Sequence, residues 1–407
     1  MGESYTGSGR SHPGAVCSDT FGPVSGLYVH IPYCARKCRY CAFHSIPIDA
    51  CSRREPYSIV DTILRHGTET AAIAATARSV YVGGGTPSVL TTKLLGHLID
   101  GLSTLAPHAQ EFTVEANPTS LTAETLDLLA SCGVTRLSVG IQTLDAGLAD
   151  VLGRALTDES VVRMIRSRWN GSLSADLLFA VTADTLWQTE RDVATLAGLG
   201  FDHLSIYELG VEPGTPLAAS GHPPGSSYAD RDAAWTDLLG TLSRAGFVRY
   251  EVASFTTEGH RCVHNLAYWH GDDYLGLGPS AVSTLHAGTD VVRIAQPESH
   301  QRFAANDSFF DGNVEHVDRP ALILERFMVS LRTVDGLDRG RFRSDFGVDA
   351  VELVPATLAR ATDQHLLSVT DTAVQPTAEG IDLLDRILVG VANELAATYR
   401  SDERPES

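Results

Sequence analysis

Short apolar runs alternate with amphipathic stretches through the first 211 residues of the chain. The runs are rich in Val, Ile, Leu and Tyr, as strands are, and helical-period stretches such as 122–133 and 185–200 lie between them. Both stretches begin at Thr and end at Gly, which are helix boundary residues. The six predicted strands are 27–32, 79–85, 111–117, 136–142, 173–181 and 203–211.

Strands that alternate with helices at this spacing pair in parallel, which predicts an α/β fold, either a βα barrel or an open doubly wound sheet. In a barrel, chemistry gathers where the strands end. A carboxylate there, such as Glu115, is costly to bury without a partner, although it could instead cap the helix predicted after Pro118. The polar residues at these ends are Glu115, Asn117, Gln142, Asp176, Tyr207 and Glu208.

The later part of the chain is organised differently. The pattern becomes irregular past His264, and helices are predicted at 321–331, 351–361 and 379–399. We therefore expect a flexible N-terminal tail over 1–25, a core over 26–255, a connecting segment over 256–317 and a small, mainly helical C-terminal domain over 318–400.

Composition describes an ordinary globular protein, with 407 residues, 43% hydrophobic and 20% charged. There is no apolar run of about 18 residues, so no membrane span is expected, and the Gly/Ser-rich start lacks an apolar h-region, so we expect a loose tail rather than a signal peptide. Seven cysteines, an odd number, favour a reducing, cytoplasmic location. The net charge of −19 disfavours binding to nucleic acid or anionic lipid.

Three cysteines, Cys34, Cys38 and Cys41, follow the first strand with the spacing C-x3-C-x2-C. Three thiolates on one loop can hold three irons of a [4Fe–4S] cube and leave the fourth iron open to a small molecule. Zinc with His30 or His44 as fourth ligand is the alternative, but structural zinc sites usually pair their ligands in two separated couples.

The cysteine loop is also basic. One of only two lysines, Lys37, stands between Arg36 and Arg39, and Arg53 and Arg54 follow. On an acidic protein, this basic island suits an acidic electron donor, such as a flavodoxin or ferredoxin, or a carboxylated ligand. The alternative is a set of solvated loop charges.

Two further motifs suggest ligands. The turn 83–87 is bare glycine backbone without the G-K-[ST] of a phosphate loop, so it either packs tightly or borders a pocket for a ligand with amine and carboxylate ends. The segment 262–269 combines Cys, His and two aromatic residues. It could bind a flat macrocycle through His264, or its rings could fill the open side of the barrel.

Taken together, the motifs resemble one radical SAM branch, which contains oxygen-independent coproporphyrinogen III oxidase and the heme chaperone HemW. The resemblance runs from about residue 26 to 395 and implies a partial (β/α)6 barrel. The motifs that carry it, in order, are Tyr28-VHIPYCARKCRYC, Gly83-GGTPS, Glu115-ANP, Arg136-LSVGIQ, Leu152-GR, Ser205-IYELGVEPGTP, His264-NLAYW, Glu325-RFMVSLRTVDG and Thr377-AEGIDLLDRIL.

By this resemblance, the three cysteines ligate the cluster and S-adenosylmethionine (SAM) chelates its open iron. Residues at the positions of a first SAM are Tyr28, Gly84 and Glu115. Residues at the positions of a second SAM, as in the oxidase, are Tyr40, Gly85, Thr86, Gln142, Arg154 and Asp176.

Two differences separate the branches. The oxidase has a fourth Cys where this chain has Phe43, and the chaperone branch has the motif H-N-x-x-Y-W. The resemblance therefore implies a protein that binds heme and passes it to an acceptor, with His264 as the candidate heme contact; decarboxylation of coproporphyrinogen III is the alternative. The residues that match the motif are His264, Asn265, Tyr268 and Trp269.

The chain also departs from the branch. After Asp176 it lacks the Gly, Pro and Gln of the usual D-L-x-x-G-L-P-x-Q-T, it has Ala155 where His is usual, and 278–282 replaces G-A-G-A-H. The first departure falls where the second SAM is expected.

Overall fold

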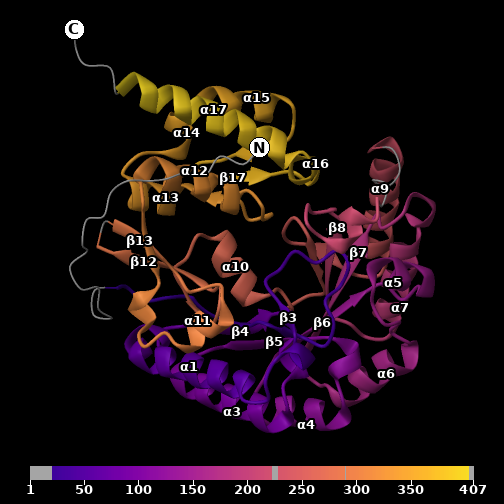
Figure 1. Ribbon diagram of the computed structural model, residues 1–407. Helices are drawn as coiled ribbons and strands as arrows, with labels where there is room; N and C mark the ends of the chain where they lie inside the picture. Colours follow the sequence, from indigo (N-terminus) through magenta and orange to yellow (C-terminus); the bar gives the residue numbers. More distant parts are fainter. Residues whose placement is uncertain (1–20, 222–227, 289, 403–407) are drawn as a thin grey trace.

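The six predicted strands form the centre of the protein, seen in a computed structural model that describes residues 21–221, 228–288 and 290–402 (Figure 1). They pair in chain order and all in parallel, which confirms the partial βα barrel. The strands are β1 (Gly26–Ile31), β4 (Ser79–Gly84), β5 (Glu111–Ala116), β6 (Arg136–Gln142), β7 (Ser172–Phe179) and β8 (His203–Glu208).

Helices cover the outer face of this sheet (Figure 1). The sequence marks where several of them begin: Thr122, for example, accepts a hydrogen bond from the backbone N–H of Thr125 and so caps the helix that buries Leu126 and Leu129. The main covering helices are α1 (Glu55–Glu69), α3 (Thr92–Leu105), α4 (Ala123–Ser131), α6 (Glu159–Arg168), α7 (Gln188–Gly198) and α9 (Tyr228–Arg244).

The segment after residue 256 is more regular than its sequence suggests. β11 (Tyr274–Leu277) pairs in parallel with β1, and three antiparallel strands extend the sheet beyond it: β12 (Val282–Ala287), β13 (Asp290–Ala295) and β14 (Asn313–Val317). At the other edge, β10 (Ser254–Thr256) and β9 (Val248–Arg249) follow β8. The alternation of β12 is hidden because one of its buried positions is the polar Ser283.

The C-terminal part has its own hydrophobic core around Phe327, Phe342 and Val391. Helices lie in the three regions where they were expected, 321–331, 351–361 and 379–399, whereas the helix at 339–346 and a small sheet were not expected. The helices are α12 (Arg319–Ser330), α13 (Arg339–Phe346), α14 (Ala350–Leu353), α15 (Pro355–Asp363), α16 (Ala378–Asp382) and α17 (Leu384–Asp402). The sheet is β15 (Leu337–Asp338), β17 (Ala373–Pro376) and β16 (Leu367–Val369).

The predicted N-terminal tail falls outside the described residues as far as residue 20. From there the chain is packed: Val24 is buried and its N–H donates to Oγ1 of Thr76 at 2.8 Å. Within the described ranges, no helix combines the length and apolar character needed to cross a bilayer.

Candidate functional site

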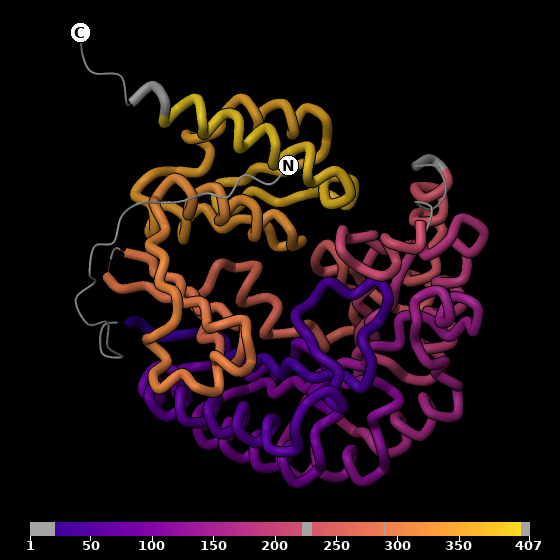
Figure 2. Tube along the Cα trace, viewed as in Figure 1, coloured from indigo at the N-terminus to yellow at the C-terminus, as the bar shows by residue number. Residues whose placement is uncertain are grey.

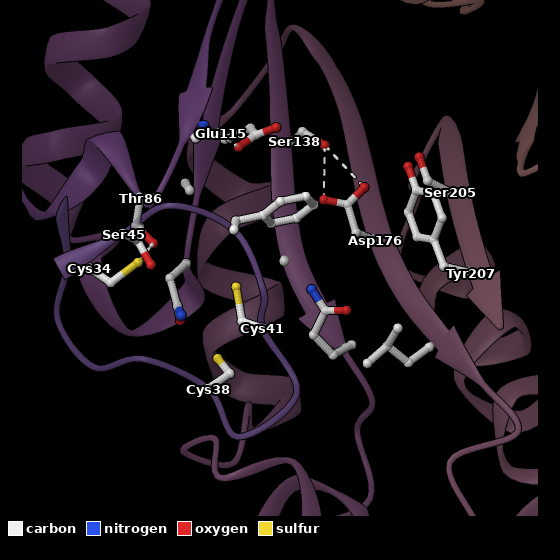
Figure 3. Close-up of a pocket in the computed structure, with 18 of the residues that line it drawn as sticks. Cys34, Cys38, Cys41, Ser45, Thr86, Glu115, Ser138, Asp176, Ser205 and Tyr207 are labelled. Atoms are coloured by element: carbon white, nitrogen blue, oxygen red, sulfur yellow. Dashed lines mark hydrogen bonds between the residues drawn. The ribbon is translucent and has the colours of Figure 1, made fainter. Parts of the chain in front are cut away.

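A cavity of about 590 Å³ occupies the inside of the barrel and opens where the parallel strands end. The cysteine loop forms one wall, and the ends of β4 to β8 form the other (Figure 3). Of the residues expected to bind cofactors, those that line this cavity are Cys34, Cys38, Tyr40, Cys41, Gly84, Gly85, Thr86, Glu115, Gln142, Arg154, Asp176 and Asn265.

The cysteine loop is anchored at both ends. At its base, β2 (Tyr33–Cys34) pairs in parallel with β3 (Ile46–Pro47). At the far side of the loop, the backbone N–H of Arg39 donates to the carbonyl of Leu152 at 3.0 Å. The carbonyl of Arg39 accepts from the N–H of Leu217 at 2.8 Å. The indigo loop after β1 therefore lies against the magenta segments in Figure 2.

The three thiols face the cavity beside one another (Figure 3). Nη1 of Arg154 donates to Sγ of Cys38 at 3.2 Å, and Oγ1 of Thr86 lies 3.7 Å from Sγ of Cys34. Burial is the main cause that raises the pKa of Cys41, and the adjacent Cys38 and Cys34 add to the rise. The guanidinium of Arg154 is thus placed to stabilise negative charge on sulfur.

The glycine turn at the end of β4 borders the thiols. The N–H of Gly85 donates to the carbonyl of Ile31 at 2.8 Å, and the N–H of Thr86 to that of Tyr33 at 2.7 Å. A Cβ atom on Gly85 would lie 2.5 Å from the carbonyl oxygen of Tyr33, a contact that no side chain can make. Glycine is therefore required for this loop to close on β1.

Glu115 points into the cavity and is held there by two donors. Its Oε1 accepts from the hydroxyl of Tyr81 at 2.7 Å and its Oε2 from the N–H of Gly84 at 3.2 Å. Burial and, to a smaller extent, nearby Asp176 raise the pKa of Glu115 to about 7. The alternative expected role, capping of the following helical turn, belongs instead to Asn117.

Asp176 and Gln142 lie on the same strand wall as Glu115, on β7 and β6. Ser138 donates to Asp176 at 3.3 Å, and burial raises the pKa of this aspartate to about 6 (Figure 3). Gln142 has a left-handed backbone, with φ of 65°, at a bulge between β6 and β7. Because such a conformation is unusual for a residue with a side chain, we attribute it to the position of Gln142 on the cavity wall.

Four of the expected residues do not line the cavity: Tyr28, His264, Tyr268 and Trp269. The hydroxyl of Tyr28 pairs with Nδ1 of His30 at 3.0 Å. His264 is only 1% exposed, its Nδ1 pairs with the hydroxyl of Ser79 at 2.9 Å, and its ring stacks on Tyr81. Its Nε2 is buried without a hydrogen-bond partner, and burial lowers the pKa of the imidazole to about 3.

The helix that carries these aromatic residues, α10 (Val263–Trp269), is fixed at its start by Glu111. The carboxylate accepts from the backbone N–H groups of Val263 at 3.1 Å and His264 at 3.0 Å, and from Sγ of Cys262 at 3.4 Å. Arg136 pairs with the same carboxylate at 2.9 Å. In this conformation His264 is closed off from any ligand in the cavity.

Comparison with known proteins supplies the family. Residues 28–168 match the model of the Radical SAM superfamily, and residues 317–383 match that of the HemN C-terminal domain. The chain is 30% identical over 389 residues to a protein of Bacillus subtilis named heme chaperone HemW, covering 91% of this chain and all of that one. The chain belongs to the HemW family of radical SAM proteins.

Other relatives of this HemW-family chain extend beyond bacteria. It is 32% identical over 404 residues to the mouse protein named radical S-adenosyl methionine domain-containing protein 1, mitochondrial, covering 94% of this chain and 90% of that one. The solved structure of coproporphyrinogen III oxidase (HemN) from Escherichia coli has a TM-score of 0.74, with 20% identity and 92% of each chain covered. That likeness describes the fold.

Radical SAM membership implies a [4Fe–4S] cluster and SAM, and the residues of this HemW-family site fit both. Three thiols on one loop share a cavity with the guanidinium of Arg154 and the carboxyl groups of Glu115 and Asp176, among other residues. Within the described ranges, no three His, Cys, Asp or Glu side chains converge as a single metal ion requires. That finding is compatible with a cube, because each thiolate then binds a different iron.

Several cavity residues were missed from the sequence, namely Tyr81, Thr113, Ser138, Ser174 and Ser205. Their signal is the two-residue period of a strand, since each lies an even number of positions from a residue that was found, such as Ser138 from Gln142. A hydroxyl residue in an apolar run marks the inward face of the barrel.

Proposed function

We propose that the protein is a heme chaperone, which binds heme and passes it to an acceptor protein, and which holds a [4Fe–4S] cluster and SAM in its barrel. The observation that carries this proposal is the 30% identity across the whole length of a relative named heme chaperone HemW. Phe43 supports it, since the resemblance places a fourth Cys there in the oxidase.

The cavity residues take roles that follow from their chemistry. Cys34, Cys38 and Cys41 would each hold one iron, and the loaded cluster would supply an electron to SAM at the fourth. Glu115 suits a ribose hydroxyl or an ammonium, because a cation favours the charged form of its carboxyl group. Arg154 suits a carboxylate.

A second SAM molecule would contact the cysteine loop, the glycine turn after β4 and the ends of β6 and β7. The residues proposed for it are Tyr40, Gly85, Thr86, Gln142, Arg154 and Asp176, and all of them line the same cavity as Gly84 and Glu115. Ser138, which donates to Asp176, would orient that carboxylate.

Anaerobic reconstitution with iron and sulfide, followed by two assays on one sample, tests the proposal. We expect a brown protein that binds hemin, with a change in the Soret absorption, and that forms no protoporphyrinogen when given coproporphyrinogen III, SAM and a reductant. Formation of protoporphyrinogen would show that the protein is an oxidase. A colourless protein that contains zinc would show that the three cysteines hold zinc rather than a cluster.

A variant with Cys34, Cys38 and Cys41 all changed to Ala is the matched control. It removes the cluster while leaving Arg154, Glu115 and Asp176 in place. If this variant loses the brown colour but keeps the circular dichroism spectrum of the folded protein, the cluster is bound by the cysteine loop.

A further inference from the structure

The rim of the cavity carries an exposed aromatic ring. Phe43 is 74% exposed, more than any other large hydrophobic side chain among the described residues, and it lines the cavity. An apolar ring in this position is in contact with water, although a flat ligand that entered the cavity would cover it.

Two cations line the same cavity as this ring. Arg36 and Lys37 are exposed and line the cavity, and neither has a carboxylate partner within the described ranges. Nζ of Lys37 donates to the backbone carbonyl oxygen of Phe43 at 3.1 Å, so the ammonium group is tied to the residue that carries the ring. Among the described residues, three acidic side chains line the cavity, those of Glu115, Asp176 and Glu212.

An apolar ring beside two free cations matches a flat, apolar molecule that carries carboxylates. Heme has this chemistry, with a planar macrocycle and two propionates. A protein with a net charge of −19 repels a dianion over most of its surface, so a local pair of cations decides where it docks.

We propose that heme docks at the cavity rim, with its macrocycle against Phe43 and its propionates toward Arg36 and Lys37. This proposal rests on the proposed function and names its site. It differs from the expectation for His264, whose Nε2 is enclosed behind Tyr81 and α10. It also differs from an electron-donor site, because the three residues face a concave wall rather than a flat surface.

Hemin titration of the full-length, reconstituted protein tests the rim site. The variants are Phe43→Ser, Phe43→Trp, Lys37→Glu and His264→Ala. The chain offers matched controls in its only other lysine, Lys93→Glu, which is exposed on α3, and in the exposed ring of α1, Tyr57→Ser. The cluster absorbance of each variant is measured first, and each is titrated with hemin and with hemin dimethyl ester, which lacks the two charges.

We expect Phe43→Ser to weaken binding of both ligands by roughly tenfold or more, and Phe43→Trp to restore it. Lys37→Glu should weaken hemin about three- to tenfold at low salt, with no effect on the ester. His264→Ala and both controls should bind hemin as the unmodified protein does.

Other outcomes overturn the rim site in distinguishable ways. If the unmodified protein binds no hemin, the proposed function itself fails. If it binds hemin and only the His264→Ala variant loses affinity for hemin, heme binds at α10. If Lys37→Glu leaves hemin affinity unchanged but slows cluster reduction by an acidic electron carrier, the basic island serves a protein donor.

Discussion

The hydroxyl of Tyr81 donates a 2.7 Å hydrogen bond to Oε1 of Glu115. The same ring stacks on the imidazole of His264, with 5.0 Å between the ring centres. One side chain on β4 therefore contacts both the carboxyl group assigned to SAM and the residue that the resemblance assigned to heme. The effect of a substitution at Glu115 is therefore best measured in a protein that keeps Tyr81.

Replacing Glu115 by Gln should make the SAM-free protein more stable at pH 8. Burial raises the pKa of this carboxyl group to about 7 from an ordinary value of 4.5, so the folded state binds its proton more tightly than the unfolded state. Its contribution to stability is therefore largest below pH 4.5 and is lost as pH rises through 7. We expect the variant to gain about 3 kcal/mol at pH 8 and little at pH 4.5, measured as melting temperatures. A gain that is the same at both pH values would contradict this account.

Replacing Arg154 by Gln should lower the reduction potential of the cluster. Nη1 of Arg154 donates to Sγ of Cys38 at 3.2 Å, and hydrogen bonds to sulfur, like positive charge, favour the reduced form. The affinity for the second SAM molecule should fall roughly tenfold with the loss of a partner for its carboxylate. Potentiometric titration and equilibrium binding measure the two effects. Arg168→Gln, on the exposed outer surface, is the control and should leave both values unchanged.

Replacing Gly85 by Ala should prevent the cysteine loop from closing. The added Cβ would lie 2.5 Å from the carbonyl oxygen of Tyr33 and 2.9 Å from that of Ile31. We expect reduced iron content per chain and a loss of about 1–3 kcal/mol in stability. Gly198→Ala, in helix α7 with no atom within 4 Å of the added carbon, should leave both quantities unchanged or raise stability slightly.

Replacing Glu111 by Gln should be among the most destabilising changes in the barrel. It leaves Arg136, which is 4% exposed, without its paired charge and weakens the cap of α10. Removing one partner of a buried pair costs about 3–5 kcal/mol, whereas Asp127→Asn, which breaks the exposed pair with Arg168, should cost less than about 1 kcal/mol. If the two variants lose the same free energy of unfolding in urea, the Glu111–Arg136 pair stabilises the fold no more than the exposed pair does.

The core strands and the cavity wall could be predicted because their signals are local. Gly85, Glu115 and Gln142 each end a run of apolar, β-prone residues, and parallel strands bring such ends together. The four strands β11 to β14 could not be predicted in the same way. In β12, Ser283 occupies a buried position that an apolar residue would have marked, and β11 has only four residues.

The environment of α10 could not be predicted from the sequence, for a different reason. The motif at His264 shows which residues are present, but not which side of a seven-residue helix is buried. That depends on Ser79 and Glu111, which lie more than 150 positions earlier in the chain. Contacts at such separations leave no periodic trace in the sequence near His264.

The parallel pairing of β1 with β11 also constrains when the protein becomes complete during synthesis. Residues 26–29 pair with 274–277, so about two thirds of the chain must leave the ribosome before the first strand acquires its second neighbour. Until then one edge of β1 offers unsatisfied hydrogen-bonding groups to any passing strand, which is a recognised route to aggregation. A nascent chain that stalls before residue 274 would therefore need protection, although its cysteine loop has already been made.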